Sequence, residues 1–531
     1  MTERTTADLV AASEPFEPRP LGDLVARLEA HDLLRHADPG TAEAVVVRGI
    51  SYDSRRIRPG AVFVAVAGDH VDGHAFAGAA VAGGAVGVVV ESPISGLAAP
   101  QIVVASTRRA LADAACWWYG DPSHELSVVG ITGTDGKTTT SYLAAAALDA
   151  VGLRTGLVGT IETRIGGVVE SDHEHQTTPE PPELQAVLRA MVAAGDTVAI
   201  VETTSHGLAL DRVGGVAYDA AVFTNLSHEH LDLHGTYESY RDAKLRLFEG
   251  LSGATDGHLP RSGIVNGDDA EADRFAAATR SAGARLITYG LGPSVDVRGR
   301  DVEVAAGGCR FAVTTDGWDG PIALRIGGRF NVHNALAVVA LGRAWGLDPE
   351  AVREGIESVP RIPGRMEPIA VGQPFDVVVD FAHSPASLGT VLDELVPLAA
   401  SRGGSVVAVF GSAGERDTAK RPLMGRIAGE RCRIVVLTDE DPRGEDGAVI
   451  LDEIAAGAEQ AGRRRGSDLL LIRDRRAAIA AAFERARPGD IVLLAGKGHE
   501  RSIIGPDGPA PWDEAAVARE ILRLTGFEDS G

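Results

Sequence analysis

A glycine-rich loop with one lysine and several threonines lies between an apolar run and an Ala-rich stretch of helical length. The loop consists of Gly133, Thr134, Asp135, Gly136, Lys137 and Thr138, with Thr139 directly behind it. Glycines let backbone amides approach an anion closely, a helix N-terminus attracts phosphate, and a lysine adds a point charge. The Thr138 hydroxyl is then placed to ligate Mg²⁺ beside the phosphates. The loop predicts nucleotide binding.

The strict P-loop pattern is not met, because Ile131 stands where that pattern requires glycine. An ordinary glycine-rich turn with a solvated lysine is therefore the alternative. The ordered succession of strand, loop, Gly-Lys-Thr and helix makes this alternative the weaker explanation.

A second segment concentrates metal-binding side chains. Residues 227–235 read Ser-His-Glu-His-Leu-Asp-Leu-His-Gly, which places three histidines and two carboxylates within seven positions. Such a cluster indicates a metal. The H-x-H-x-D-H motif of metallo-β-lactamase-type hydrolases is an alternative, but it requires histidine where the chain has Leu233. That alternative would also leave the phosphate loop without a role.

Two further residues complete the candidate chemistry. Glu202 directly follows the apolar run Val198–Val201, and sites of α/β proteins gather at strand ends. Lys244 lies in a helical stretch, where a lysine near a metal is unusual because a cation repels a cation. Its amine becomes useful if it reacts with CO2 to give a carbamate, which resembles a carboxylate ligand. Taken alone, Lys244 is better explained as a surface lysine on a helix than as a metal ligand.

Short apolar runs that alternate with Ala- and Leu-rich helical stretches must position these residues. The runs are Val62–Val66, Val86–Val90, Leu126–Ile131, Thr197–Val201, Ala220–Phe223, Val377–Val379, Val406–Phe410, Ile434–Leu437 and Ile491–Leu494. Continuous apolar strands between helices predict an α/β fold with parallel sheets buried on both faces. Residues 291–326 instead predict a β-rich excursion. We place domain boundaries near residues 122 and 359.

Composition excludes several classes of protein. A length of 531 residues suggests three or four domains, and the net charge of −23 argues against binding to nucleic acid or an anionic membrane. The longest uncharged apolar run has 16 residues, which is short of the ~20 needed to span a membrane. Three isolated cysteines and an N-terminus without an apolar signal region predict a cytoplasmic location. Whether the first 20 or so residues are ordered is left open by the sequence.

These segments together resemble the Mur ligases, the ATP-dependent amide-bond-forming enzymes of peptidoglycan assembly, and among them those that add the third amino acid. The matching motifs are Asp53-Ser54-Arg55, Asp72-Gly73-His74, Gly133–Thr138, Thr177-Thr178-Pro179, Glu202 with Ser205-His206-Gly207, His230-Leu231-Asp232, Ala243-Lys244, Asn331 with His333-Asn334, Pro363–Glu367, Asp380–His383, Asp441-Pro442-Arg443 and Gly496–Glu500. The resemblance covers nearly the whole chain from about residue 45.

The resemblance implies a three-domain Mur ligase architecture. Residues 1–122 would bind the UDP-linked substrate, residues 123–358 would form a P-loop-like ATPase domain, and residues 359–531 would form a Rossmann-like domain for the incoming amino acid. The implied reaction joins a diamino acid, for which we favour meso-2,6-diaminopimelate, to UDP-N-acetylmuramoyl-L-alanyl-D-glutamate (the UDP-MurNAc-dipeptide) through an acyl phosphate. ATP and Mg²⁺ are the implied cofactors, and a monomer without nucleic-acid or membrane partners is expected.

The resemblance also implies roles for individual residues. Lys137 would hold the β- and γ-phosphates, and Mg²⁺ would be held by Thr138, Glu202, His230 and a carbamylated Lys244. ATP would contact Asn334, Arg365 and Asp380 besides the loop residues. The nucleotide-peptide substrate would contact Ser54, Thr177, Thr178, Thr204 and Arg212. The amino acid would contact Arg416, Glu440, Asp441, Pro442, Arg443, Gly496 and Glu500.

Several positions depart from the common family pattern. Asp135 and Asp441 each replace an asparagine, Glu229 replaces an aspartate, and Leu210 replaces a polar residue. Asp441 leaves the third substrate open, so L-lysine and L-ornithine remain alternatives to diaminopimelate. Two further functions compete with this interpretation. One is a related ligase that acts on another acid, as in folylpolyglutamate or cyanophycin synthesis, and the second is an inactive nucleotide-binding homologue.

Overall fold

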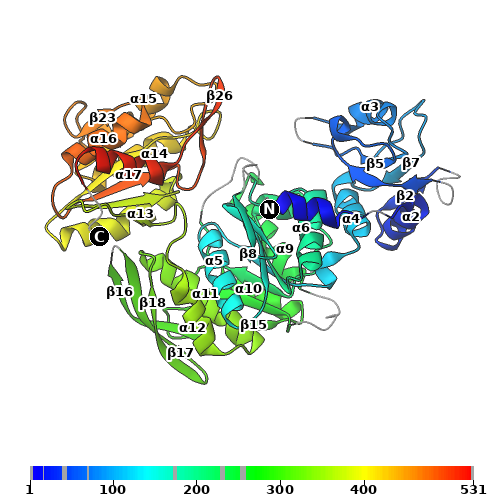
Figure 1. Cartoon of the computed structure of the whole chain (residues 1–531), viewed down its shortest axis with the longest axis horizontal. Helices are drawn as coiled ribbons and strands as arrows, with labels where there is room; N and C mark the ends of the chain where they lie inside the picture. The colour runs from blue at the N-terminus through cyan, green and yellow to red at the C-terminus, as the bar shows by residue number, and fades with distance from the viewer. Residues whose placement is uncertain are drawn as a thin grey trace.

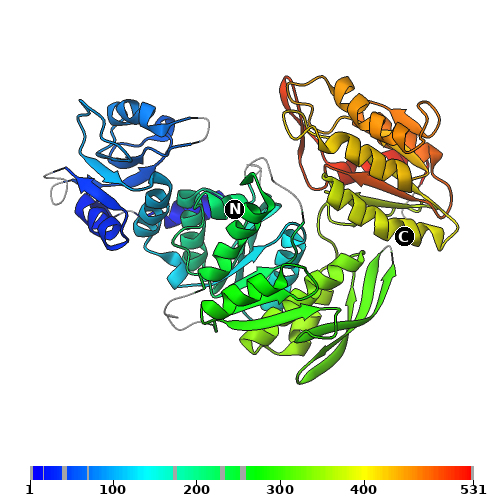
Figure 2. The same cartoon turned by 180° about the vertical axis from the view of Figure 1, so that it is seen from behind.

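The computed structural model describes residues 4–15, 17–38, 45–68, 71–171, 176–227, 234–251, 259–305 and 307–527. The chain forms three lobes that follow one another in sequence, each built on its own sheet (Figure 1). The view from behind shows the middle lobe between the other two (Figure 2).

The N-terminal lobe is a five-stranded sheet of order β2-β7-β6-β5-β4. Its elements are α2 (Leu21–Ala30), β2 (Leu34–Ala37), β4 (Gly49–Ser51), η1 (Ser54–Arg56), β5 (Ala61–Val64), η2 (Gly73–Phe76), α3 (Ala77–Ala82), β6 (Gly87–Val90), β7 (Gln101–Val104) and α4 (Thr107–Tyr119), with the small pair β1 (Arg19–Pro20) and β3 (Val46–Val47). The first helix, α1 (Thr6–Ser13), packs instead on α6 of the middle lobe, where the Thr6 amide donates to Glu170.

The middle lobe holds an eleven-stranded sheet of order β11-β10-β9-β12-β8-β13-β14-β15-β16-β17-β18. The strands are β8 (Ser127–Thr132), β9 (Thr155–Val158), β10 (Glu162–Ile165), β11 (Val168–Ser171), β12 (Val198–Glu202), β13 (Ala220–Phe223), β14 (Ser262–Asn266), β15 (Arg285–Gly290), β16 (Val297–Ala305), β17 (Gly308–Thr315) and β18 (Trp318–Leu324). The run from β9 to β16 is parallel, and antiparallel strands extend it at both edges.

Helices cover both faces of this sheet, which is why its central strands are continuously apolar. One face packs against α5 (Lys137–Ala150), α11 (Arg329–Trp345) and α12 (Pro349–Ser358), and the other against α6 (Pro181–Ala194), α9 (Tyr237–Glu249) and α10 (Ala272–Ser281). The carboxyl ends of β8, β12 and β13 therefore meet at one edge, and the loops that leave them form one site. The short α7 (Ser205–Ala209) follows β12 there.

The C-terminal lobe has a six-stranded sheet of order β19-β20-β24-β21-β22-β23, in which only β19 is antiparallel. Its elements are β19 (Glu367–Ile369), β20 (Asp376–Asp380), α13 (Pro385–Ala400), β21 (Val406–Phe410), α14 (Lys420–Arg431), β22 (Ile434–Leu437), α15 (Gly447–Gln460), β23 (Leu469–Leu471), α16 (Arg475–Arg485), β24 (Ile491–Ala495), β25 (Ser502–Gly505), β26 (Gly508–Pro511) and α17 (Glu514–Leu524).

The predicted α/β class with parallel sheets is confirmed, and so is the β-rich excursion, which forms β16 to β18. The predicted boundaries near 122 and 359 lie between α4 and β8 and between α12 and β19. All three cysteines are buried and unpaired. Over the described ranges, no helix has the length and apolarity to span a membrane.

Candidate active site

The glycine loop connects the end of β8 to the start of α5. The space around its two glycines is too small for a side chain. Gly133 and Gly136 have φ angles of +147° and +87°. A Cβ at Gly133 would lie 1.8 Å from Thr224 Oγ1, and one at Gly136 would lie 2.4 Å from Asn334 Oδ1. Both positions therefore require glycine, because the left-handed backbone and the close contact each exclude a larger residue.

The end of β13 fixes the backbone of this loop. Thr224 Oγ1 donates to the Asp135 carbonyl at 2.6 Å, and the Asp135 amide donates to Asn225 Oδ1 at 3.0 Å. The Thr134 amide donates to the Asn225 carbonyl at 2.8 Å. Because these bonds use only the backbone of Asp135, and its side chain is exposed, an aspartate fits where the family pattern has asparagine.

Two lysines reach the same carbonyl oxygen of the loop. Lys137 Nζ donates to the carbonyls of Gly133 and Thr134 at 3.0 and 2.7 Å, and Lys244 Nζ donates to the Gly133 carbonyl at 2.8 Å. The Lys244 side chain is only 1% exposed and lies 4.6 Å from the centre of the Tyr240 ring. The interpretation of Lys244 as a surface lysine is therefore wrong, and two cationic side chains face the position expected for phosphates.

Glu202, the last residue of β12, carries a completely buried carboxylate. It accepts hydrogen bonds from Thr138 Oγ1 at 3.0 Å and from Thr160 Oγ1 at 2.9 Å. Within the described ranges it forms no ion pair, whereas buried charges are normally paired or bound to a metal. A hydroxyl and a carboxylate oxygen at one point fit Mg²⁺, which prefers oxygen ligands. The third predicted ligand, His230, lies outside the described residues.

The residues predicted to hold the nucleotide-peptide substrate surround Glu202. Thr178 Oγ1 donates to the Glu202 carbonyl at 2.8 Å and lies 3.0 Å from Thr204 Oγ1. Arg212 Nη1 donates to the Thr178 carbonyl at 3.1 Å. Thr177 Oγ1 lies 3.0 Å from Thr160 Oγ1, the second hydroxyl that binds the Glu202 carboxylate. Ser54 lies apart from this set, in η1 of the N-terminal lobe.

A turn after residue 363 joins the phosphate loop to the C-terminal lobe. Arg365 Nη2 lies 3.4 Å from Thr138 Oγ1, and its guanidinium lies 4.6 Å from the centre of the Phe381 ring. A Cβ at Gly364 would lie 2.2 Å from the His499 amide nitrogen, so this turn also packs closely against the loop after β24. Asp380 accepts from the amides of Met366 and Ala382. Burial raises the pKa of this carboxyl, although Arg365 opposes the shift.

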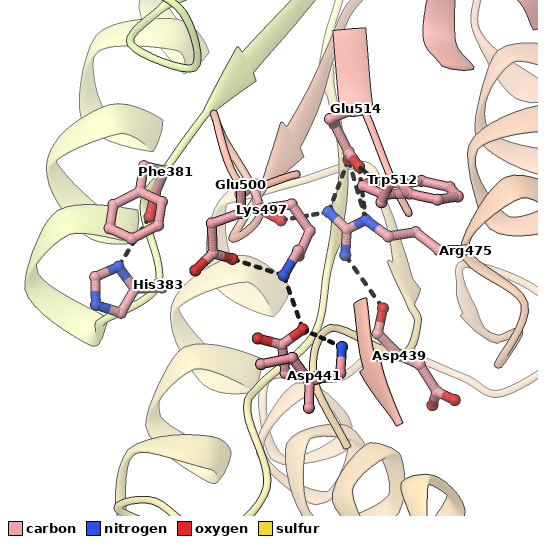
Figure 3. Close-up of polar contacts among 11 residues, drawn as sticks. Phe381, His383, Asp439, Asp441, Arg475, Lys497, Glu500, Trp512 and Glu514 are labelled. Carbon is pink, nitrogen blue, oxygen red and sulfur yellow. Dashed lines mark hydrogen bonds and ion pairs between the residues drawn. The ribbon is translucent and has the colours of Figure 1, made fainter. Parts of the chain in front are cut away.

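The loops after β21, β22 and β24 gather carboxylates at the carboxyl edge of the C-terminal sheet, where open α/β sheets have their ligand crevice. Lys497 Nζ lies 2.8 Å from Asp441 Oδ1 and 2.6 Å from Glu500 Oε2 (Figure 3). Burial raises the pKa of the Glu500 carboxyl, and Lys497 partly offsets that rise. Glu440 is 6% exposed, and its Oε2 finds no hydrogen-bond partner within the described part of the chain. A Cβ at Gly496 would lie 2.6 Å from this same oxygen.

Two guanidinium groups of this lobe remain available for an anion. Arg443 has a φ angle of +53° and donates its backbone amide to the Ile504 carbonyl. Its side chain makes no ion pair with any described residue. Glu445, two residues further along the chain, pairs with Arg421 at 2.9 Å. Arg416 is exposed and is likewise unpaired among the described residues.

A buried ion pair behind the crevice holds two of its loops. Arg475 and Glu514 are 2% and 1% exposed and lie 2.7 Å apart. Arg475 also donates to the carbonyls of Asp439 and Ala495, which lie at the ends of the loops that carry Asp441 and Lys497 (Figure 3). Sequence reasoning gave Arg475, Glu514 and Lys497 no role. Only Lys497 had a signal, its place inside Gly496–Glu500.

Family comparisons agree with this geometry. Residues 46–119 match the model described as "Mur ligase family, catalytic domain", residues 131–342 match "Mur ligase middle domain", and residues 364–498 match "Mur ligase, glutamate ligase domain". Among curated relatives, the UDP-N-acetylmuramyl-tripeptide synthetase of Roseiflexus sp. is 47% identical over 94% of this chain and 100% of its own length. The UDP-N-acetylmuramoyl-L-alanyl-D-glutamate--2,6-diaminopimelate ligase of Solibacter usitatus is 41% identical over 96% of this chain and 99% of its own length.

Solved structures show the same architecture. A UDP-N-acetylmuramoyl-L-alanyl-D-glutamate--2,6-diaminopimelate ligase superimposes with a TM-score of 0.64 at 30% identity, covering 94% of this chain and 99% of the other. The MurF ligase of Thermotoga maritima in complex with ADP gives a TM-score of 0.59 at 19% identity, covering 90% and 97%, and bears on the fold alone.

Replacement of Lys137 by alanine tests the phosphate loop. We expect Lys137→Ala to lower nucleotide-dependent turnover roughly 10²- to 10³-fold, because a charge positioned against the transferred phosphoryl group is lost. The measurement is phosphate release by the folded variant. Arg154→Ala, which removes an exposed cation at the opposite edge of the same sheet, is the control and is expected to keep full turnover. Near-normal turnover in Lys137→Ala would refute the assignment of the loop.

Proposed function

Because this chain belongs to the Mur ligase family, we propose that it is an ATP-dependent ligase that adds a diamino acid to UDP-N-acetylmuramoyl-L-alanyl-D-glutamate in peptidoglycan synthesis. The names of its relatives support this substrate, since they are tripeptide synthetases and diaminopimelate ligases. The expected product is an amide on the D-glutamate carboxyl group. We expect the enzyme to act as a monomer in the cytoplasm.

The observation that carries the proposal is the buried carboxylate of Glu202. It lies between the Thr138 hydroxyl at the phosphate loop and the threonines predicted to bind the nucleotide-peptide substrate. A site of this kind brings a phosphoryl group and an acceptor carboxylate together. Mg²⁺ bound by Thr138 and Glu202, with His230 as a further proposed ligand, would supply charge neutralisation for phosphoryl transfer.

In the first step, the substrate carboxylate attacks the γ-phosphorus of ATP, and the bond to the β-phosphate oxygen breaks. An acyl phosphate and ADP result. Lys137 and the loop amides neutralise charge on the transferred group, while Gly133 and Gly136 permit the close backbone approach that this requires. Asn334, beside Gly136, is placed to contact the nucleotide.

In the second step, the amine of the amino acid attacks the acyl carbon, and phosphate leaves with the electron pair of the broken C–O bond. The amine must reach this carbon as a free base, so its proton goes to solvent or to a carboxylate of the crevice. Glu440 and Glu500 can receive the ammonium groups of the substrate, and the turn at Gly364 and Arg365 connects this crevice with the phosphate loop. Bringing both sites together limits hydrolysis of the acyl phosphate.

We favour meso-2,6-diaminopimelate as the third substrate. It carries a second carboxylate at its distal end, which lysine and ornithine lack. The Arg443 guanidinium makes no ion pair with any described residue, and a guanidinium binds a carboxylate through two parallel hydrogen bonds. Arg416 adds a second cation for a substrate carboxylate.

Loss of Arg443 should remove the selection of diaminopimelate. In Arg443→Ala we expect the preference for diaminopimelate over L-lysine and L-ornithine to fall roughly 100-fold, the effect of one charge-assisted contact of a few kcal/mol. The measurement is kcat/KM for each amino acid with the UDP-dipeptide. Arg476→Ala is the control, because Arg476 is partly exposed and its guanidinium pairs with Glu520, which joins α16 to α17. A wild type that prefers lysine, or an Arg443→Ala variant with full discrimination, would reject the choice of diaminopimelate.

We further propose that Lys244 carries a carbamate. Addition of CO2 to the neutral amine forms an N–C bond and releases one proton, which converts a cation into an anion. The 1% exposure of Lys244 and its place beside the half-buried Lys137 on the Gly133 carbonyl support this, because two ammonium groups so close together repel each other. A carbamate beside Lys137 would instead attract it and add an oxygen ligand for Mg²⁺.

Chemical rescue tests the carbamate. Lys244→Ala should lose activity, and a short added carboxylate such as acetate should restore part of it by replacing the missing negative charge. Lys137→Ala, whose missing group is a cation, should not respond to acetate. Crystals at neutral pH should show density for a carboxylate group on Lys244 Nζ. Normal activity in Lys244→Ala would show that the carbamate is not needed.

A further inference from the structure

The chain uses lysine very sparingly. Of its 51 basic side chains only four are lysines, at positions 137, 244, 420 and 497, and all others are arginines. Lys137 and Lys244 meet at the phosphate loop, and Lys420 donates to the His383 carbonyl. Lysine differs from arginine in being a compact ammonium group without a planar fork. Lys497 is therefore one of four side chains in this sequence that offer such a compact charge.

Lys497 is the most enclosed of the four lysines. Its side chain is 0% exposed, and its ammonium bridges Asp441 Oδ1 and Glu500 Oε2 (Figure 3). Asp441 Oδ1 also accepts from the Ile504 amide at 2.9 Å, and the Ile504 carbonyl accepts from the Arg443 amide. Lys497 thus holds the Asp441 carboxylate in place. That carboxylate binds strand β25 through the Ile504 amide, and the same strand binds the Arg443 backbone.

The charges of the crevice explain what this bridge achieves. Asp441 and Glu500 together bring two negative charges, and Lys497 cancels one of them. Arg475 is committed to Glu514 and does not pair with either carboxylate. Among the described residues, nothing binds Glu440 Oε2 or pairs with the Arg443 guanidinium, so the first lacks a hydrogen-bond donor and the second lacks an anionic partner. Without Lys497, a second substrate carboxylate would approach two uncompensated negative charges.

We propose that Lys497 is a specificity-determining positioning residue, which neutralises Asp441 so that the amino-acid subsite accepts a substrate with a second carboxylate. This inference rests on the proposed ligase function. It also explains how aspartate can occupy position 441, where the family pattern has asparagine. The added negative charge is compensated from 56 residues away in the sequence.

A series of variants with graded charge tests the role of Lys497. Asp441→Asn makes the crevice one charge more positive, Lys497→Met makes it one charge more negative, and Lys497→Met/Asp441→Asn restores the original net charge. The readout is the ratio of kcat/KM for diaminopimelate to kcat/KM for L-lysine. We expect it to rise about tenfold in Asp441→Asn, to fall about tenfold in Lys497→Met and to return in the double variant. One unit charge at several ångströms gives a change of about this size.

Arg433→Met is the matched control for loss of a buried ion pair. Arg433 pairs with the buried Asp490 at the opposite, amino end of the same sheet. This variant should lower the Tm and leave the ratio unchanged. The KM for ATP should remain unchanged in the charge series, while the KM for the amino acid shifts.

The outcomes separate the inference from the proposed function. A wild type that joins neither amino acid to the UDP-dipeptide refutes the proposed function. If the wild type is active but the diaminopimelate-to-lysine ratio of kcat/KM stays constant through the series, the role of Lys497 is wrong and the proposed function stands. The same holds if the ratio of the double variant is as low as that of Lys497→Met. If Lys497→Met fails to fold, the role of Lys497 is decided by the other two variants. The ratio must rise in Asp441→Asn and return to the wild-type value in the double variant.

Discussion

The completely buried carboxylate of Glu202 is the constraint on which the middle lobe depends. Burial removes several kcal/mol of hydration from an ion, and hydrogen bonds from two hydroxyls and the Thr160 amide return only part of it. The donors come from separate elements, since Thr138 opens α5 and Thr160 lies between β9 and β10. The strand order β9-β12-β8 brings these elements together, so the sheet topology and the site satisfy the same requirement. The negative charge that these hydrogen bonds do not compensate would favour the binding of a cation beside Glu202.

The C-terminal lobe also contains buried carboxylates, but several of these are paired with cationic side chains of the protein. There the buried carboxylates of Asp441 and Glu514 are compensated by the protein's own cations, Lys497 and Arg475. Breaking such a buried pair is costly, since it leaves an uncompensated charge. In the proposed function, the middle lobe would leave the negative charge of Glu202 for an external cation. The C-terminal lobe pairs Asp441 and Glu514 with its own cations, and Glu440 and Arg443 would bind the ammonium and carboxylate groups of the amino acid.

Much of this architecture could be predicted from the sequence, because it is encoded locally. Apolar runs such as Ala220–Phe223 and Ile434–Leu437 coincide with strands, and the glycine loop opens a helix as expected. Pairings across long sequence distances could not be predicted. Arg365 meets Thr138 from 227 residues away, and no local pattern records that contact. From the sequence alone, Lys244 is better explained as a surface residue, and that interpretation is wrong because the sheet covers its face of the helix, which the helix alone does not indicate.

Gly364 lies where the middle lobe and the C-terminal lobe are in contact. Its φ of +63° turns the chain so that the next residue, Arg365, reaches Thr138, while its own missing side chain lets the His499 amide approach. His499 lies between Lys497 and Glu500 in the same loop, so the turn contacts the phosphate loop and the amino-acid crevice at once. An acyl phosphate survives only if an amine reaches it before water does. In the proposed reaction, this single turn in contact with both loops would connect the place where the intermediate forms with the place where the amine consumes it.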